Sequence, residues 1–172
     1  MIRYLFTFLL IFFAVFSRLL PHPPNVAPIT AIALFSSVYL DKKYAFIIPV
    51  AAMLISDYFI GFHENIIFVY GSFIIISIIG VWLRRHRSIM TTLGASVAGS
   101  IIFFMVTNFG VWIMPDSMYQ TDLSGLLNCY VAAIPFFRNT LIGDLFYVNA
   151  IFGLYELMKK IFPSILLEES QA

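Results

Sequence analysis

The sequence predicts an all-α integral membrane protein, a bundle of six transmembrane helices with both termini in the cytoplasm. Of the 172 residues, 61% are hydrophobic and 11% are charged, whereas soluble domains carry about 25% charged residues. The mean hydropathy is +0.94, and a water-soluble fold of this size could not bury so much apolar surface. In addition, the basic residues gather in alternate connections between the apolar stretches, as the positive-inside rule requires.

The first two predicted spans are separated by a proline-rich break. Residues 2–20 are interrupted only by Arg3 at the start and Arg18 near the end, and the stretch is long enough to cross a bilayer core. They also fit a secretory signal peptide, although Val15 stands where a cleavage site prefers a small side chain. Whether this stretch is retained or cleaved therefore stays open. The prolines within residues 21–24 interrupt the helical pattern, and residues 25–40 resume it.

Three long apolar stretches follow, at residues 43–61, 65–83 and 88–114. The last region, residues 123–162, is too long for one straight span and too short for two. If Lys159 marks the inner interface, counting back about 20 residues places the last span at 139–157. Residues 123–137 are then expected to form an extra short helix on the outer face, ended by Pro135.

The connecting charges set the predicted orientation. Eight of the ten Lys and Arg residues fall on one side of a six-span arrangement: Arg3, Lys42, Lys43, Arg84, Arg85, Arg87, Lys159 and Lys160. We therefore expect a multi-pass protein of the bacterial inner (plasma) membrane. It forms a single domain, residues 1–172, with an outer-face segment at 115–138 and a C-terminal tail at 158–172.

Polar and aromatic residues cluster in the outer halves of the predicted spans, which indicates a cavity that opens outward. Arg138 falls at the outer interface, where its long stem can snorkel. Asp144 lies about 7 Å deeper, and a carboxylate there costs roughly 2.5–3.5 kcal/mol without a partner or water. We expect both to meet groups on other spans. The predicted ligand-binding residues are Arg18, His22, Asn25, Asp57, Asn108, Trp112, Tyr130, Arg138, Asn139 and Asp144.

Two alternatives to a ligand site remain. In a structural protein with no ligand, Arg18 would pair with Asp57 or Asp144 and only fix helix packing. In an intramembrane enzyme or accessory subunit, Asp57 with His63, or Asp144 with His22, would transfer protons. The phosphate-loop, HExxH, GxSxG and CxxC motifs are absent from the sequence, and Cys129 is the only cysteine. We therefore expect no enzyme activity, cofactor or metal, and the net charge of +1 gives no basis for binding nucleic acid.

Several motifs together resemble an uncharacterised family of bacterial multi-span membrane proteins, over most of the chain. They lie at residues 18–28, 33–35, 55–57, 107–112, 129–130 and 134–144. More loosely, six spans with both ends inside are similar to the substrate-binding S component of energy-coupling-factor (ECF) transporters. The proline-led second span and the third span ending in Ser56-Asp57 carry that similarity.

The second resemblance implies a subunit that captures a vitamin or cofactor precursor from the outer face for uptake. Transport would then require an ATPase-driven coupling module as a partner, besides the solute and the lipid bilayer. S components usually contact the coupling subunit through an Ala-x-x-x-Ala motif in the first span, where this chain has Ala14 and Ser17. The identity of the solute and the oligomeric state stay open.

Overall fold

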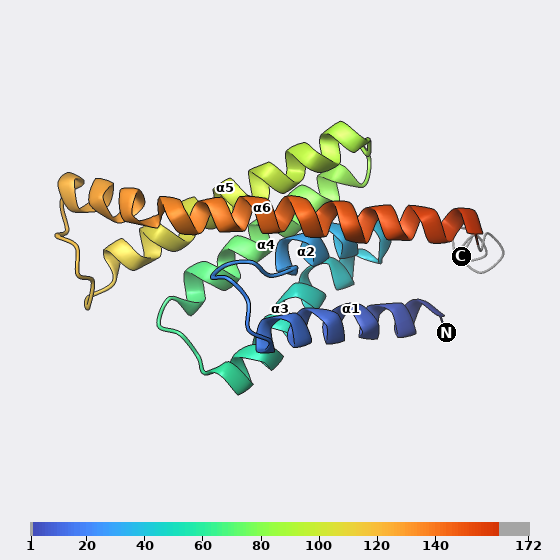
Figure 1. Ribbon diagram of the computed structural model, residues 1–172, viewed down its shortest axis with the longest axis horizontal. Helices are drawn as coiled ribbons and strands as arrows, with labels where there is room; N and C mark the ends of the chain where they lie inside the picture. Colours follow the sequence, from blue (N-terminus) through green and yellow to red (C-terminus); the bar gives the residue numbers. More distant parts are fainter. Residues whose placement is uncertain (1, 162–172) are drawn as a thin grey trace.

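The computed structural model describes the backbone of residues 2–161 and the side chains of residues 8–161. Within these residues the chain forms six α-helices (Figure 1), which confirms the predicted all-α architecture. The helices are α1 (Ile2–Leu19), α2 (Ile29–Tyr39), α3 (Lys42–Ile60), α4 (Ile66–Leu83), α5 (Ile89–Ile113) and α6 (Leu123–Ile161).

Four helices, α3, α4, α5 and α6, are long and apolar enough to cross a membrane, and they identify a multi-pass membrane protein. Helices α1, α3, α4 and α5 begin and end within one residue of the predicted stretches. Local caps explain two of these boundaries. The Ser88 hydroxyl accepts a hydrogen bond of 3.1 Å from the Thr91 backbone N–H at the start of α5, and Gly61, with φ of 105°, ends α3.

Helix α6 corrects the prediction for the last region. It runs without a break over 39 residues, so a separate short helix at 123–137 before a span at 139–157 is wrong. Pro135 lies inside α6. Its missing N–H removes only one backbone hydrogen bond, and a membrane bundle tolerates the loss of one such bond. The helix is about 58 Å long, roughly twice the thickness of a bilayer core. One exposed apolar stripe follows its first half: Leu123, Leu127, Val131 and Ile134.

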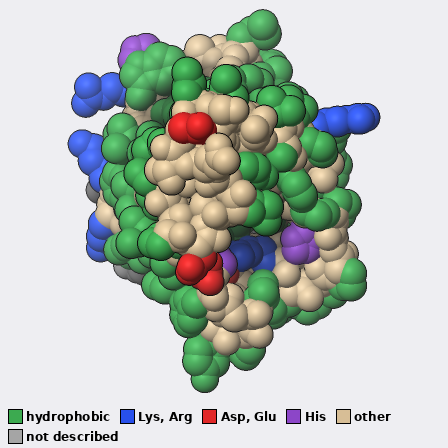
Figure 2. Space-filling model, turned by 90° about the vertical axis from the view of Figure 1, so that its left-hand side faces the viewer, with side chains coloured by type: hydrophobic (Ala, Val, Ile, Leu, Met, Phe, Trp, Pro, Cys, Tyr) green, Lys and Arg blue, Asp and Glu red, His purple; other side chains and the backbone are tan. Residues whose placement is uncertain are grey.

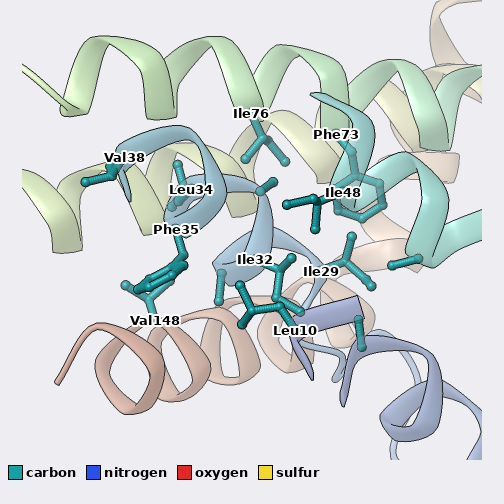
Figure 3. Close-up of a cluster of buried hydrophobic side chains, with 14 of the residues drawn as sticks. Leu10, Ile29, Ile32, Leu34, Phe35, Val38, Ile48, Phe73, Ile76 and Val148 are labelled. Atoms are coloured by element: carbon teal, nitrogen blue, oxygen red, sulfur yellow. The ribbon is translucent and has the colours of Figure 1, made fainter. Parts of the chain in front are cut away.

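Helix α2 forms the centre of the bundle and is shorter than the predicted span of residues 25–40. Asn25 takes a positive φ of 63° and Pro28 restricts the residue before it, so the helix begins only at Ile29. All its residues from 29 to 38 are buried, and α2 packs against all five other helices. Figure 3 shows its side chains directed toward the surrounding helices, among them Phe35 toward Val148 of α6.

The backbone at the C-terminal end of α2, and in the segment that leads into its N-terminal end, has partners inside the protein, as lipid surroundings demand. At its C-terminal end, Arg84 Nε donates a hydrogen bond of 3.0 Å to the Val38 carbonyl, and the same guanidinium donates to the Leu40 carbonyl. Before its N-terminal end, residues 20–28 form an irregular segment. Asn139 Nδ2 of α6 holds this segment through a hydrogen bond of 3.3 Å to the Pro24 carbonyl.

The two ends of the bundle differ in charge. The start of α1, the α2–α3 and α4–α5 connections and the end of α6 lie at one end of the molecule (Figure 1). We call it the basic end, after Lys42, Lys43, Arg84, Arg85, Arg87, Lys159 and Lys160. The opposite end carries the α1–α2, α3–α4 and α5–α6 connections, with Glu64, Asp116 and Asp122. We call it the cavity end, for the hollow described below.

Gly80 permits the close approach of α4 to α2. A Cβ atom at this position would lie 2.5 Å from the Ser37 Cβ and 3.2 Å from the Leu34 Cα. The Ser37 hydroxyl also donates a hydrogen bond of 3.1 Å to the Ser77 carbonyl. Small residues therefore allow the central helix to be enclosed.

We expect Gly80→Ala to lower the melting temperature of the protein in detergent, with an unfolding free energy reduced by about 1–3 kcal/mol. The added methyl group would collide with atoms that are fixed to the α2 backbone. Gly71→Ala is the matched control in the same helix, because a Cβ atom there meets nothing within 4 Å. Equal melting temperatures for the two variants would contradict this account of the α2–α4 contact.

Candidate functional site

A buried acidic residue lies near the end of α3. Asp57 is 1% exposed, and each of its carboxylate oxygens has a donor. Arg18 Nη2 of α1 donates to Oδ1 at 2.7 Å, and the Tyr70 hydroxyl of α4 donates to Oδ2 at 2.8 Å. Arg18 also contacts the sulfur of Met53. The carboxylate charge is thus compensated inside the bundle, and the three side chains together join α1, α3 and α4.

Helix ends explain why these groups meet. Arg18 lies in the last turn of α1, where the helix dipole favours a cation. Asp57 lies in the last turn of α3, where the same dipole disfavours an anion, so the carboxylate gains from a guanidinium partner. After Gly61 the chain turns back and brings His63 Nδ1 to 3.8 Å from Asp57 Oδ2.

A second buried acidic residue, Asp144, has different partners. It lies in α6, is 2% exposed and accepts a hydrogen bond of 2.7 Å from the Ser100 hydroxyl of α5. The Thr30 hydroxyl, in the first turn of α2, also bonds to it. Within the described side chains, Asp144 forms no ion pair. The N-terminal dipole of α2 and the two hydroxyls therefore supply its stabilisation.

Arg18 and Asp144 both line one cavity of about 260 Å³ at the cavity end. Figure 2 views this end and shows a hollow with Lys or Arg and His side chains inside it. The polar lining consists of Arg18, His22, Asn25, Thr30, His63, Thr140 and Asp144. The apolar lining consists of Ala27, Ile29, Met53, Val69, Phe73 and Phe103.

A second hollow of about 210 Å³ continues the first. The two share four lining residues: Asn25, Val69, Phe103 and Thr140. Asn65 and Asn108 line only the second hollow, together with aromatic side chains of α5 and α6. The combined space extends between α4, α5 and α6 toward the α5–α6 connection.

The structure brings together six of the ten predicted ligand-binding residues. Arg18, His22, Asn25 and Asp144 line the first hollow, Asn108 lines the second, and Asp57 holds Arg18. The other four lie outside both hollows. The Trp112 indole N–H donates to the Gln120 carbonyl at 2.9 Å, the Tyr130 hydroxyl donates to the Met105 carbonyl at 2.8 Å, and Asn139 holds the α1–α2 segment. Arg138 is exposed on α6.

Several residues at or beside the first hollow were absent from the predicted ligand-binding set, although His63 was named as a possible partner of Asp57 in proton transfer. Thr30 and Ser100 bond to Asp144, Tyr70 bonds to Asp57, and His63 and Thr140 line the first hollow. Thr30 follows Pro28 by two residues, which is a signal for the first turn of a helix. Tyr70 and Ser100 gave no comparable signal, because single hydroxyl residues inside an apolar span are common.

Two residues that line these hollows each contain a buried polar atom without a hydrogen-bond partner among the described residues. His63 Nε2 and Asn65 Oδ1 are buried and unsatisfied among the described residues. Buried polar atoms in proteins are normally bonded, and a water or ligand often supplies the missing partner. Within the described residues, no group of three or more His, Cys, Asp or Glu is arranged to hold a metal ion. The hollows therefore offer hydrogen-bonding groups and aromatic walls.

Comparison with known proteins gives a family without an assigned activity. Residues 1–165 match a family of unknown function (DUF6580). No curated protein and no solved structure matches the chain.

We expect Arg18 and Asp57 to be energetically coupled. Arg18→Met leaves an uncompensated carboxylate and Asp57→Leu an uncompensated guanidinium, so each change should cost about 3–5 kcal/mol of unfolding free energy. The double variant should cost clearly less than the sum, because it removes both charges. The unfolding free energies of the wild type, the two single variants and the double variant, measured in detergent, give the coupling between the two groups. Additive costs would show that the two groups do not stabilise each other.

Proposed function

The chain belongs to the family of unknown function DUF6580, and we propose that it is an integral membrane subunit that binds a small solute for uptake. One observation carries this proposal: Arg18 and Asp144, from different helices, line a single cavity at the cavity end. Ionisable residues within membrane segments are costly and usually mark a solute or ion pathway. The solute class that we propose is a vitamin or cofactor precursor.

The chemistry of the two hollows supports a solute with both polar and flat apolar parts. Arg18 and Asn25 in the first hollow and Asn108 in the second offer hydrogen-bonding groups to a bound molecule. Phe73 and Phe103 supply apolar and aromatic surface. Taken together, the hollows fall within the range of about 300–1,000 Å³ that is usual for small-molecule pockets.

The proposed topology has six spans and both termini in the cytoplasm of a bacterial inner membrane. The positive-inside rule places the basic end in the cytoplasm, so the cavity opens outward. Helix α2 and residues 20–28 together make the second crossing, because irregular backbone is tolerated where protein surrounds it. With this topology the protein is S-component-like, and an ATPase-driven coupling module is its proposed partner.

The enzyme alternative that pairs Asp57 with His63 has weaker support from the geometry. Both oxygens of Asp57 are bonded, to Arg18 and Tyr70, and His63 Nδ1 stands 3.8 Å from the carboxylate. That separation exceeds a hydrogen bond. A proton relay between Asp57 and His63 would require one of these partners to move.

We expect a vitamin or cofactor precursor to raise the melting temperature of the purified protein, and Asp144→Asn to abolish that rise. The amide has the shape of the carboxylate but lacks its charge, so folding is kept while the cavity changes. A thermal-shift screen against vitamins and their precursors measures the rise in melting temperature, and mass spectrometry identifies any copurified molecule.

Arg138→Gln is the matched control, since Arg138 is exposed and lies outside both hollows. This variant should respond to the same molecule as the wild type. If no molecule in the screen stabilises the protein and none copurifies, solute binding is contradicted. An equal loss of response in both variants would place the binding site elsewhere.

We expect single-cysteine labelling to report the proposed orientation. In a Cys129→Ala background, a membrane-impermeant maleimide should label Ser117→Cys, in the α5–α6 connection, on intact cells. His86→Cys, in the α4–α5 connection, should be labelled only after permeabilisation. The reverse pattern would place the basic end outside and refute the proposed topology.

A further inference from the structure

A groove of about 450 Å³ lies between α5 and α6 at the basic end, far along the bundle from the proposed solute site. The hydrogen bonds that join α5 to α6 lie nearer the cavity end: Ser100 to Asp144, Tyr130 to Met105 and Cys129 to Asn108. Figure 1 shows the start of α5 well separated from the last turns of α6. The groove lies in the space where α5 and α6 diverge.

The walls of the groove are mostly apolar, with Thr92 and Asn149 as polar members. Ile89 and Leu93 come from α5, and Val148 and Phe152 from α6. Gly153 also lines it, and a Cβ atom at Gly153 would meet nothing within 4 Å. The missing side chain leaves an open, apolar channel beside helices that face the bilayer, which suits a hydrocarbon chain.

The mouth of the groove carries excess positive charge. Arg87 lies 3.4 Å from Glu156 and stacks 4.8 Å from the centre of the Tyr39 ring. Lys159 lies 3.3 Å from the same Glu156 carboxylate. Two cations thus share one carboxylate, and Arg87 is still 38% exposed. The exposed Ser88 hydroxyl lies beside Arg87 in the lining.

We propose that this groove binds one anionic glycerophospholipid. Its phosphate meets Arg87 and Lys159 at the mouth, and one acyl chain lies along Leu93, Val148 and Phe152. A basic mouth above an apolar channel is complementary to a negative headgroup above a hydrocarbon chain. The inference is independent of the solute site, because none of these residues lines the cavity near Asp144.

The charge of the mouth is tested by lipid titration of the delipidated protein in a neutral detergent, read by native mass spectrometry. Dioleoyl phosphatidylglycerol should bind about fivefold more tightly than dioleoyl phosphatidylcholine, which corresponds to one net basic contact. Arg87→Gln should remove this preference. Arg138→Gln, an exposed arginine at the other end, should keep it. Equal affinity of the wild type for the two lipids would overturn the proposal.

The shape of the groove is tested separately by Gly153→Leu. The added side chain should occupy the channel without disturbing the fold, so the tightest bound phosphatidylglycerol is lost while the melting temperature is kept. Gly71→Leu in α4 is the control, since that site is equally free of neighbours. If both variants retain phosphatidylglycerol as the wild type does, the lipid lies elsewhere and the proposal fails.

Discussion

The architecture depends on a helix that is too short to cross a bilayer and is enclosed by the other five. With 11 residues, α2 is about 16 Å long, whereas a bilayer core is about 30 Å thick. Its ends therefore lie within the protein, where every backbone polar group needs an internal partner. The surrounding helices are positioned by this requirement, and small residues such as Gly80 let them close around α2.

The two ends of α2 have different partners, and the candidate site lies at the N-terminal end. Arg84 closes the C-terminal end by bonding to two carbonyls. The N-terminal end meets the buried carboxyl group of Asp144 instead. The chain before α2 is irregular and leaves space beside this carboxylate, and Arg18 lines the other part of the same space. Asp57 fixes Arg18 and so has a positioning role behind the cavity.

The sequence predicted most of the helices and the main charged residues, because apolar length and charge distribution are local properties. Helices α3, α4 and α5 begin or end where charges, a glycine or a cap interrupt the apolar pattern. The pairing of Arg18 with Asp57 was one of two alternatives, since the choice depends on how deep α1 and α3 lie relative to each other. The continuity of α6 through Pro135 was missed because a proline is compatible with both a break and a tolerated kink. Trp112 and Tyr130 bond to nearby backbone carbonyls, which residue type alone does not reveal.

The length of helix α6 is large relative to the thickness of a bilayer. At about 58 Å it fits within a hydrocarbon layer of about 30 Å only at a tilt near 60°, beyond the usual range of up to about 40°. Exposed apolar side chains nevertheless lie on both sides of the exposed Arg138, from Leu123 to Phe146, so a bilayer of ordinary thickness would have to adjust to α6. Because a hydrogen bond joins Asp144 of α6 to Ser100 of α5, a change in the tilt of α6 with membrane thickness would also move one wall of the cavity.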